Sequence, residues 1–163
     1  MVSHETKLEW IDDNHVNIIG PITETSDFHS LEYPKKNISE IFINFKNMTR
    51  MNSNGVKKWL QSLEKFPYNK IHYTNCSTAL VEQMSIVSEF LKPKIIVDSF
   101  EARYVCQNCN EVHLVDFVIG KDIQPGQEEY LDEPEKKCPK CGELMEFDHN
   151  PDSYFYFLTK LIP

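Results

Sequence analysis

The sequence lacks any long hydrophobic segment, and no apolar run approaches the roughly 18 residues that a helix needs to cross a bilayer. Its opening residues, MVSHETKLEW, are polar and charged, so they do not form the apolar core of a secretion signal. We therefore expect a cytoplasmic protein with no membrane partner. Hydrophobic residues make up 40% of the 163 residues. This is enough to form the hydrophobic core of one domain, with or without a small appended segment.

Basic side chains are scarce toward the C-terminus. Residues 106–163 contain 5 basic and 12 acidic residues, a net charge of −7, whereas residues 1–105 carry a net charge of −1. Binding of nucleic acid requires a basic surface that neutralises phosphates. A nucleic-acid-binding role for this segment is therefore an alternative that its charge disfavours, and we expect no nucleic-acid partner.

Four of the five cysteines form two CxxC pairs. They are Cys106, Cys109, Cys138 and Cys141. Two residues between cysteines let both sulfurs turn toward one point, and two such knuckles supply the four ligands of a tetrahedral metal site. Each knuckle is followed by a turn residue and a strand-like run, over 111–119 and 143–147. This pattern predicts a small C-terminal zinc ribbon over residues 106–150.

The ligand set determines what this site can do. Four thiolates fill the coordination sphere of one ion, so the expected site is structural and leaves no position for water or substrate. Two disulfides are the alternative, but a reducing cytoplasm disfavours them. His113 or His149 could replace a cysteine, although all four cysteines already have suitable spacing. The second knuckle, Cys-Pro-Lys-Cys-Gly, also resembles an iron-binding rubredoxin knuckle. We favour zinc because the first knuckle has Asn110 at the position where the second has this glycine.

The segment before the cysteines alternates between strand and helix patterns. Strands are expected over 7–11, 16–22, 38–45, 70–75 and 94–105, with a loop over 46–52. Apolar residues at helical spacing predict one helix from Asn52 or Ser53 to Pro67, and a second one extends from Ser77 or Thr78 to Leu91. The order predicts an α/β domain over 1–105, with a mixed sheet and helices on one face. The aromatic tail over 151–163 is expected to pack back onto this domain.

One segment carries a family resemblance. Residues 41–60, IFINFKNMTRMNSNGVKKWL, together with the order of elements, resemble a STAS domain, the fold of bacterial anti-sigma factor antagonists. The resemblance covers roughly residues 7–105. In that family an Asp-Ser-Ser-Gly or Asp-Ser-Thr-Gly motif starts a helix, and a partner kinase phosphorylates the second hydroxyl. The whole chain resembles a bacterial type in which a STAS-like domain is joined to a C-terminal zinc ribbon.

This sequence departs from the family motif. Aligned on Gly55, the family's Asp falls on Asn52, its first hydroxyl residue on Ser53 and its phosphorylated residue on Asn54. Because Asn54 cannot accept a phosphoryl group, the resemblance implies a similar binding surface but not the same switch. Ser53 is an alternative phosphorylation site, although helix capping by Ser53 or Asn52 is the favoured interpretation. The implied partner is a protein, such as a switch kinase or sigma-factor regulator, and the implied binding residues are Arg50, Asn52, Ser53, Asn54 and Lys57.

An enzyme of unknown reaction is the alternative function. Cys76 is predicted between a strand and a helix, where the helix dipole can lower the pKa of a thiol. His72 lies at alternating spacing on the same strand, and Ser53 is a second candidate centre. However, no third group orients a Cys76–His72 pair, and an inert buried thiol is more common. We therefore expect no catalytic residue and favour a non-enzymatic module for protein interaction, in bacterial signalling or gene regulation.

Overall fold

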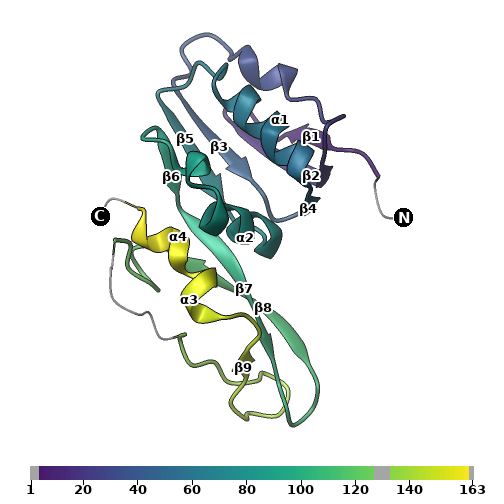
Figure 1. Cartoon of the computed structure of the whole chain (residues 1–163), viewed down its shortest axis with the longest axis vertical. Coiled ribbons are helices and arrows are strands. Elements are labelled where there is room, and N and C mark those ends of the chain that lie inside the picture. Colours follow the sequence, from purple (N-terminus) through teal and green to yellow (C-terminus); the bar gives the residue numbers. More distant parts are fainter. Residues whose placement is uncertain (1–3, 127–132, 162–163) are drawn as a thin grey trace.

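The computed structural model describes residues 4–126 and 133–161. Residues 127–132 of the expected zinc ribbon and residues 162–163 of the expected aromatic tail lie outside these ranges. A six-stranded mixed sheet with helices forms the upper part of the molecule in Figure 1, and a three-stranded antiparallel sheet extends below it. The expected mixed α/β fold is confirmed. No helix in the described ranges is both long and apolar enough to span a membrane.

The first sheet begins with an antiparallel hairpin and continues with parallel strands. Along the main path its strands are β1 (Lys7–Trp10), β2 (His15–Ile22), β3 (Glu40–Asn44), β5 (Lys70–Thr74) and β6 (Ile95–Val97). In register, Val16 lies beside Ile43, Ile43 beside Tyr73, and Tyr73 beside Val97. All four are buried, because alternate residues of each strand point to the same face of the sheet.

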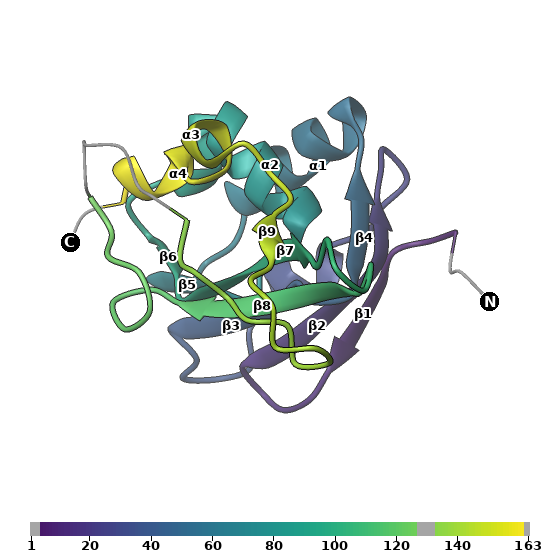
Figure 2. The same cartoon turned by 90° about the horizontal axis from the view of Figure 1, so that it is seen from below.

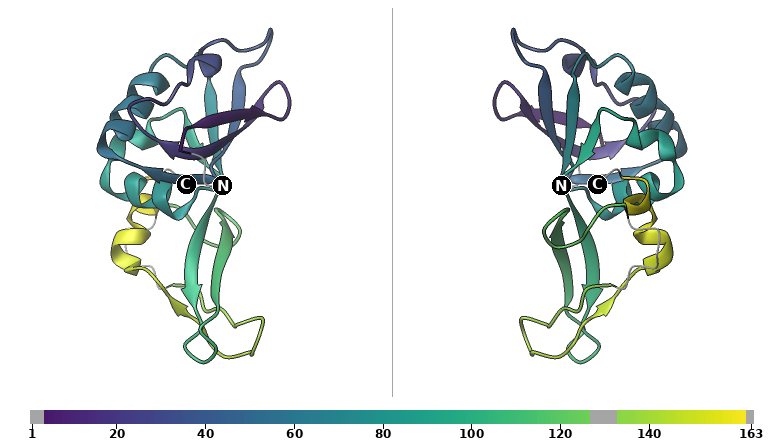
Figure 3. Two further views of the ribbon diagram at one scale, coloured as in Figure 1. Left: turned by 90° about the vertical axis from the view of Figure 1, so that its right-hand side faces the viewer. Right: turned by 90° about the vertical axis from the view of Figure 1, so that its left-hand side faces the viewer.

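Helices cover only that buried face, as Figure 3 shows. They are α1 (Ser53–Leu63) and α2 (Thr78–Ile86), with the short 3-10 helices η1 (His29–Glu32) and η2 (Ser88–Leu91). Trp59 of α1 is fully buried, and its ring packs edge-on against Phe28 and Phe45. Its indole N–H donates to the hydroxyl of Tyr73 at 3.0 Å, so this buried polar pair ties α1 to the middle of the sheet.

The structure corrects three expected boundaries. The expected loop over 46–52 contains β4 (Met48–Met51), parallel to β2; its burial does not alternate, because Met48 and Met51 are buried with two exposed residues between them. The second helix ends at Ile86, since the next residue is extended, and η2 follows. The expected strand over 94–105 is divided at Asp98 into β6 and β7 (Ser99–Val105).

The division at Asp98 changes the assignment of β7. This strand leaves the first sheet and becomes the centre of the second, between β8 (Val112–Val118) and β9 (Glu146–Phe147). Within the described residues, the parallel pairing of β5 continues onto β7 through a single bridge, from Cys76 to Phe100. The strand that was expected to close the first domain therefore belongs to the sheet that carries the cysteine knuckles.

The C-terminal tail forms two short helices, α3 (Pro151–Tyr154) and α4 (Tyr156–Thr159), which lie beside α2 in Figure 2. The Ser85 hydroxyl of α2 donates to the carbonyl of Tyr154 at 3.0 Å. Phe155 and Phe157 are buried and pack edge-on against Phe100 of β7. The tail thus shares one aromatic core with the second sheet and contacts a helix of the first lobe.

Candidate metal centre and neighbouring surfaces

The four paired cysteines converge on one point. Their sulfur atoms all lie within 4.8 Å of one another. The separation is 3.5 Å between the sulfurs of Cys106 and Cys141 and 3.6 Å between those of Cys109 and Cys138. All four are free thiols, since a disulfide requires sulfurs about 2.05 Å apart. Four sulfurs at about 2.3 Å from one zinc ion lie about 3.8 Å from each other, so this donor set fits a tetrahedral metal.

The two knuckles have the same backbone geometry. In each, the carbonyl of the first cysteine accepts the N–H of the residue four positions later, Asn110 or Gly142, at 2.8 Å. These residues adopt left-handed backbone angles, with φ of 59° for Asn110 and 79° for Gly142. Asparagine tolerates this conformation better than other non-glycine residues. The replacement at Asn110 therefore leaves the knuckle geometry intact and does not by itself distinguish zinc from iron.

The environment of the cluster acts differently on two of its sulfurs. At Cys109 the backbone N–H of Glu111 lowers the pKa, but burial and the hydrogen bonds to the other three cysteines raise it overall, to about 12. At Cys141 hydrogen bonds favour the thiolate form. The pKa of Cys141 is lowered to about 6, first by a hydrogen bond from the side chain of Asn108 and then by the backbone N–H of Glu143. Across the knuckles, the Lys140 ammonium group lies 2.7 Å from the Glu111 carboxylate. Because metals bind thiolates rather than thiols, a lowered pKa favours metal binding at neutral pH.

The two neighbouring histidines do not belong to this cluster. His149 accepts a hydrogen bond from the backbone N–H of Arg103 at its Nε2 atom, at 3.0 Å, and its ring stacks on Tyr154. The Nε2 atom of His113 is buried without a hydrogen-bond partner in the described ranges. The donor set brought together in the described part of the chain consists of the four cysteines.

The residues implied by the STAS resemblance lie at the start of α1. Asn52 caps this helix, since its side-chain oxygen accepts the N–H of Gly55 at 2.7 Å. Gly55 is buried against the end of β2, and a Cβ atom there would overlap the carbonyl group of Ile22. The other residues of this surface are exposed. We call Arg50, Asn52, Ser53, Asn54 and Lys57 the loop–helix surface.

Cys76 and His72 do not form a catalytic pair. Cys76 is fully buried, and burial raises the pKa of its thiol well above the ordinary value. The two ring nitrogens of His72 lie 2.8 Å from Glu40 and 2.8 Å from Asp98, and its ring stacks on Phe42. Both nitrogens thus have carboxylate partners, and neither serves Cys76 as a base.

The group around His72 was missed from the sequence. Its members lie on the uncovered face of the first sheet, where Phe42 is in register with His72, and Glu40 and Asp98 approach from the flanking strands. The sequence predicts the alternation of residues within each strand. It does not predict how the strands pair, because the hydrogen bonds of this group join residues more than 25 positions apart.

No family model, curated protein or solved structure matches the chain. The resemblance to STAS domains therefore rests on residues 41–60 and on the order of elements. The arguments for function rest on the geometry described above.

Proposed function

We propose that the protein is a non-enzymatic module for protein interaction and regulation, in which the four paired cysteines hold one structural zinc ion. The convergence of their sulfur atoms within 4.8 Å carries this proposal. Zinc commonly takes four cysteine thiolates in a tetrahedral site, and such a site leaves no position open for substrate. When bound, the ion would supply a cross-link between the knuckles.

The second knuckle needs such a cross-link. Residues 139–144 are all exposed. Within the described ranges, the β-pairing of the flanking chain consists of the bridge between Lys137 and Leu144 and of the two-residue strand β9. Little apolar surface is therefore buried at this knuckle, so its own packing contributes little stability. A metal ion that joins it to the turn between β7 and β8 would stabilise the lower sheet, as in a zinc ribbon, where metal binding and folding are coupled.

The upper lobe supports a STAS-like domain that presents the loop–helix surface to a protein partner. The mixed sheet with helices on one face agrees with that resemblance, and the Asn52 cap and the tight packing of Gly55 hold the surface in place. The partner class is a switch kinase or a sigma-factor regulator. Ser53 is exposed at the start of an 11-residue helix, where free N–H groups favour a phosphate, so it is the acceptor in this proposal.

Two observations disfavour the alternatives. Cys76 is buried with a raised pKa, and Ser53 has no hydrogen-bonded base in the described ranges, so neither candidate nucleophile is activated. Residues 106–163, the segment that would bind nucleic acid, carry a net charge of −7, which repels phosphates.

Photo-crosslinking in the source cell tests the proposed surface. A photoreactive amino acid is placed at Lys57 in the full chain, and a matched probe is placed at Lys121, an exposed lysine of the lower lobe. We expect position 57 to yield one regulatory protein reproducibly and position 121 not to yield it. Crosslinks of the same proteins from both positions would contradict a partner surface at the start of α1.

A further inference from the structure

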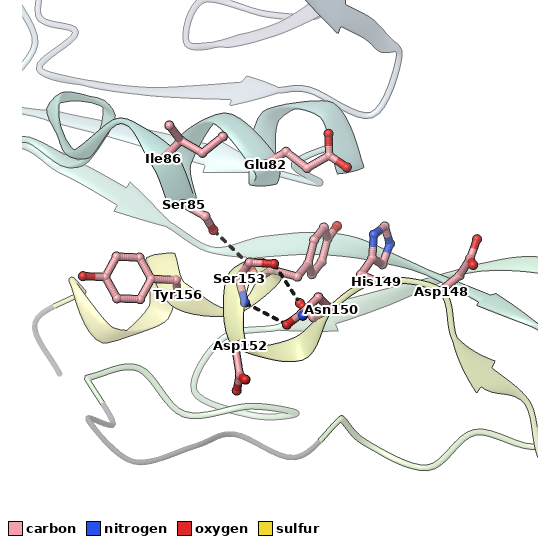
Figure 4. A pocket seen from close by; sticks show the side chains of 10 residues that line it. Glu82, Ser85, Ile86, Asp148, His149, Asn150, Asp152, Ser153 and Tyr156 are labelled. Carbon is pink, nitrogen blue, oxygen red and sulfur yellow. Dashed lines mark hydrogen bonds between the residues drawn. The ribbon is translucent and has the colours of Figure 1, made fainter.

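The groove between α2 and the C-terminal helices, drawn in Figure 4, is partly filled by the chain itself. The Lys160 ammonium group donates to the backbone carbonyl of Ser85 at 3.3 Å and lies 4.7 Å from the centre of the Tyr156 ring. The side chain of Asp152 on α3 points away from α2. The groove therefore belongs to the packing of the tail on α2. The outer edge of β8, in contrast, is not paired within the described ranges.

Strand β8 is an edge strand of the lower sheet. The order of that sheet is β8-β7-β9, and in the left view of Figure 3 β8 lies on the side away from α3 and α4. The N–H of Ile119 donates to the carbonyl of Asp98, which lies opposite it in the register of the two strands. Hydrogen-bonded pairs alternate along an antiparallel ladder, so residues 113, 115 and 117 bond to β7. The backbone groups that point outward are those of residues 112, 114, 116 and 118.

Three residues of this edge have free backbone groups. The N–H of Val118 donates to the carboxylate of Asp122, and its carbonyl accepts two backbone N–H groups of the following turn. In the described part of the chain, no hydrogen bond reaches the outward N–H and C=O groups of Val112, Leu114 and Asp116. Proteins usually protect such an edge with a short strand, a lysine, a proline or a bulge, but β8 has seven residues and none of these features. The free groups can therefore pair with one further extended strand.

Most side chains that accompany these groups are apolar. Val112, Leu114 and Val118 are 45%, 57% and 43% exposed. They occupy alternate positions of β8, on the face of the lower sheet opposite Phe117 and the aromatic core. When a partner adds a strand to a sheet, main-chain hydrogen bonds supply affinity and contacts of alternate side chains supply specificity. The edge of β8 offers both kinds of contact.

One acidic side chain interrupts the apolar row. Asp116 is exposed and has no ion-pair partner within the ranges that the structure covers. Directly opposite it in β7 lies Glu101, which is buried; burial, and then the charge of Asp116, raises the pKa of the Glu101 carboxyl group. The Lys46 ammonium group lies 4.0 Å from Glu101, and Arg103 pairs with Asp148. The protein therefore leaves the negative charge of Asp116 unbalanced at this edge.

This charge distinguishes between a second copy of the chain and a basic partner. In a two-fold pairing of β8 with a copy, centred on Leu114, Asp116 of one protomer lies opposite Val112 of the other. A carboxylate would then be buried against an apolar side chain without a partner, which is unfavourable. The net charge of −7 on residues 106–163 also makes two copies repel each other. A strand with a basic side chain opposite Asp116 avoids both penalties.

We infer that the outer edge of β8 binds an extended basic segment of a protein partner as an additional antiparallel strand. Two apolar side chains of that segment lie opposite Val112 and Leu114, and a lysine or arginine lies opposite Asp116. From its N-terminus the segment has a basic residue, then two apolar residues at alternate positions. This inference rests on the proposed function only in taking a protein as the ligand class. The edge is separate from the loop–helix surface, so failure of either one leaves the other standing.

Nuclear magnetic resonance titration of the full, zinc-loaded chain tests this inference. The probe is the acetylated and amidated peptide Thr-Thr-Lys-Thr-Val-Thr-Val. Its control carries an N-methyl group on the first valine, opposite Leu114, which removes one main-chain donor and keeps the charge and the side chains. We expect the probe to shift the amide signals of Leu114 and Asp116, and the control to bind about tenfold more weakly. Equal binding of both peptides, no binding of the probe, or shifts confined to the loop–helix surface would overturn strand addition at β8; the last result would leave the proposed function standing.

A matched pair of variants separates this site from general attraction to an acidic protein. Asp116→Asn removes the charge at the edge and keeps the shape of the side chain, while Glu89→Gln makes the same change in net charge at an exposed residue of the upper lobe. We expect Asp116→Asn to weaken binding of the probe about threefold or more, and Glu89→Gln to leave it almost unchanged. An equal loss in both would show non-specific attraction and contradict the inference. Both side chains are exposed, and well-dispersed spectra of the free variants verify that they fold.

Discussion

Gly55 packs so closely against Ile22 that a Cβ atom at position 55 would lie 2.1 Å from the Ile22 carbonyl oxygen. This contact fixes the start of α1 on the end of β2. The same helix start carries the exposed residues of the loop–helix surface, so the glycine positions that surface without forming part of it.

Replacement of this glycine should destabilise the protein even though alanine is the better helix former. Alanine gains about 1 kcal/mol in helix propensity, but the backbone overlap with Ile22 requires a shift of the helix that costs more. For Gly55→Ala we expect a net loss of about 1–3 kcal/mol in the free energy of unfolding, measured by urea denaturation. Asn54→Ala, at the exposed neighbouring position, is the control and should change stability little. A Gly55→Ala protein as stable as the control would refute the close contact.

The bridge from His72 to Glu40 should make stability depend on pH. Hydrogen bonding to His72, followed by the charges of His72 and Lys70, lowers the pKa of Glu40 below 4.5. Because this pKa is depressed in the folded state, the stabilisation is present above the ordinary glutamate pKa and disappears as the pH falls through the lower, folded value. We expect the stability difference between the wild-type protein and His72→Gln to shrink as the pH falls from about 5 to about 3.

Urea denaturation at a series of pH values measures that difference. His4→Gln is the matched control, because His4 is exposed and has no side-chain partner in the described part of the chain. A gap between wild type and His72→Gln that stays constant, or that widens in acid, would contradict a contribution from the Glu40 bridge.

Cys76 should be chemically inert in the folded protein. It is fully buried, and burial raises its pKa far from the range in which a thiolate forms at neutral pH. Treatment with iodoacetamide, followed by peptide mass spectrometry, should leave Cys76 unmodified until urea unfolds the chain. After chelation of the metal, the four paired cysteines should become reactive as well. Rapid labelling of Cys76 in the native protein would revive the enzyme hypothesis.

The parts of the structure that the sequence predicts are those with a local pattern. The spacing within each CxxC pair identifies the four sulfurs that converge, and the cap of the first helix was narrowed to Asn52 or Ser53 from their place before an amphipathic segment; the structure assigns it to Asn52. Alternation of apolar residues located β3 and β5 within about two residues of their ends. These features depend on neighbours in the chain, so one sequence is enough to identify them.

Features set by distant contacts could not be predicted in this way. Strand β4 has no alternating pattern, and the division at Asp98 depends on backbone bonds such as that from the N–H of Cys76 to the carbonyl of Ser99. Helices α3 and α4 have four residues each, too short to be stable alone, and form because their aromatic side chains are buried against β7. The groove beside α2 exists only because residues about seventy positions apart are brought together.

The central claim is that four thiolates hold one structural zinc ion. Native mass spectrometry of the full chain, before and after chelation, tests it most directly, with circular dichroism on the same samples. We predict one zinc ion per chain, lost on chelation together with the near-ultraviolet signal of the aromatic core around β7, while the helical signal of α1 and α2 persists. A coloured protein that contains iron would correct the metal. A metal-free chain that keeps its fold, with a mass lower by four hydrogens from two disulfides, would contradict the account.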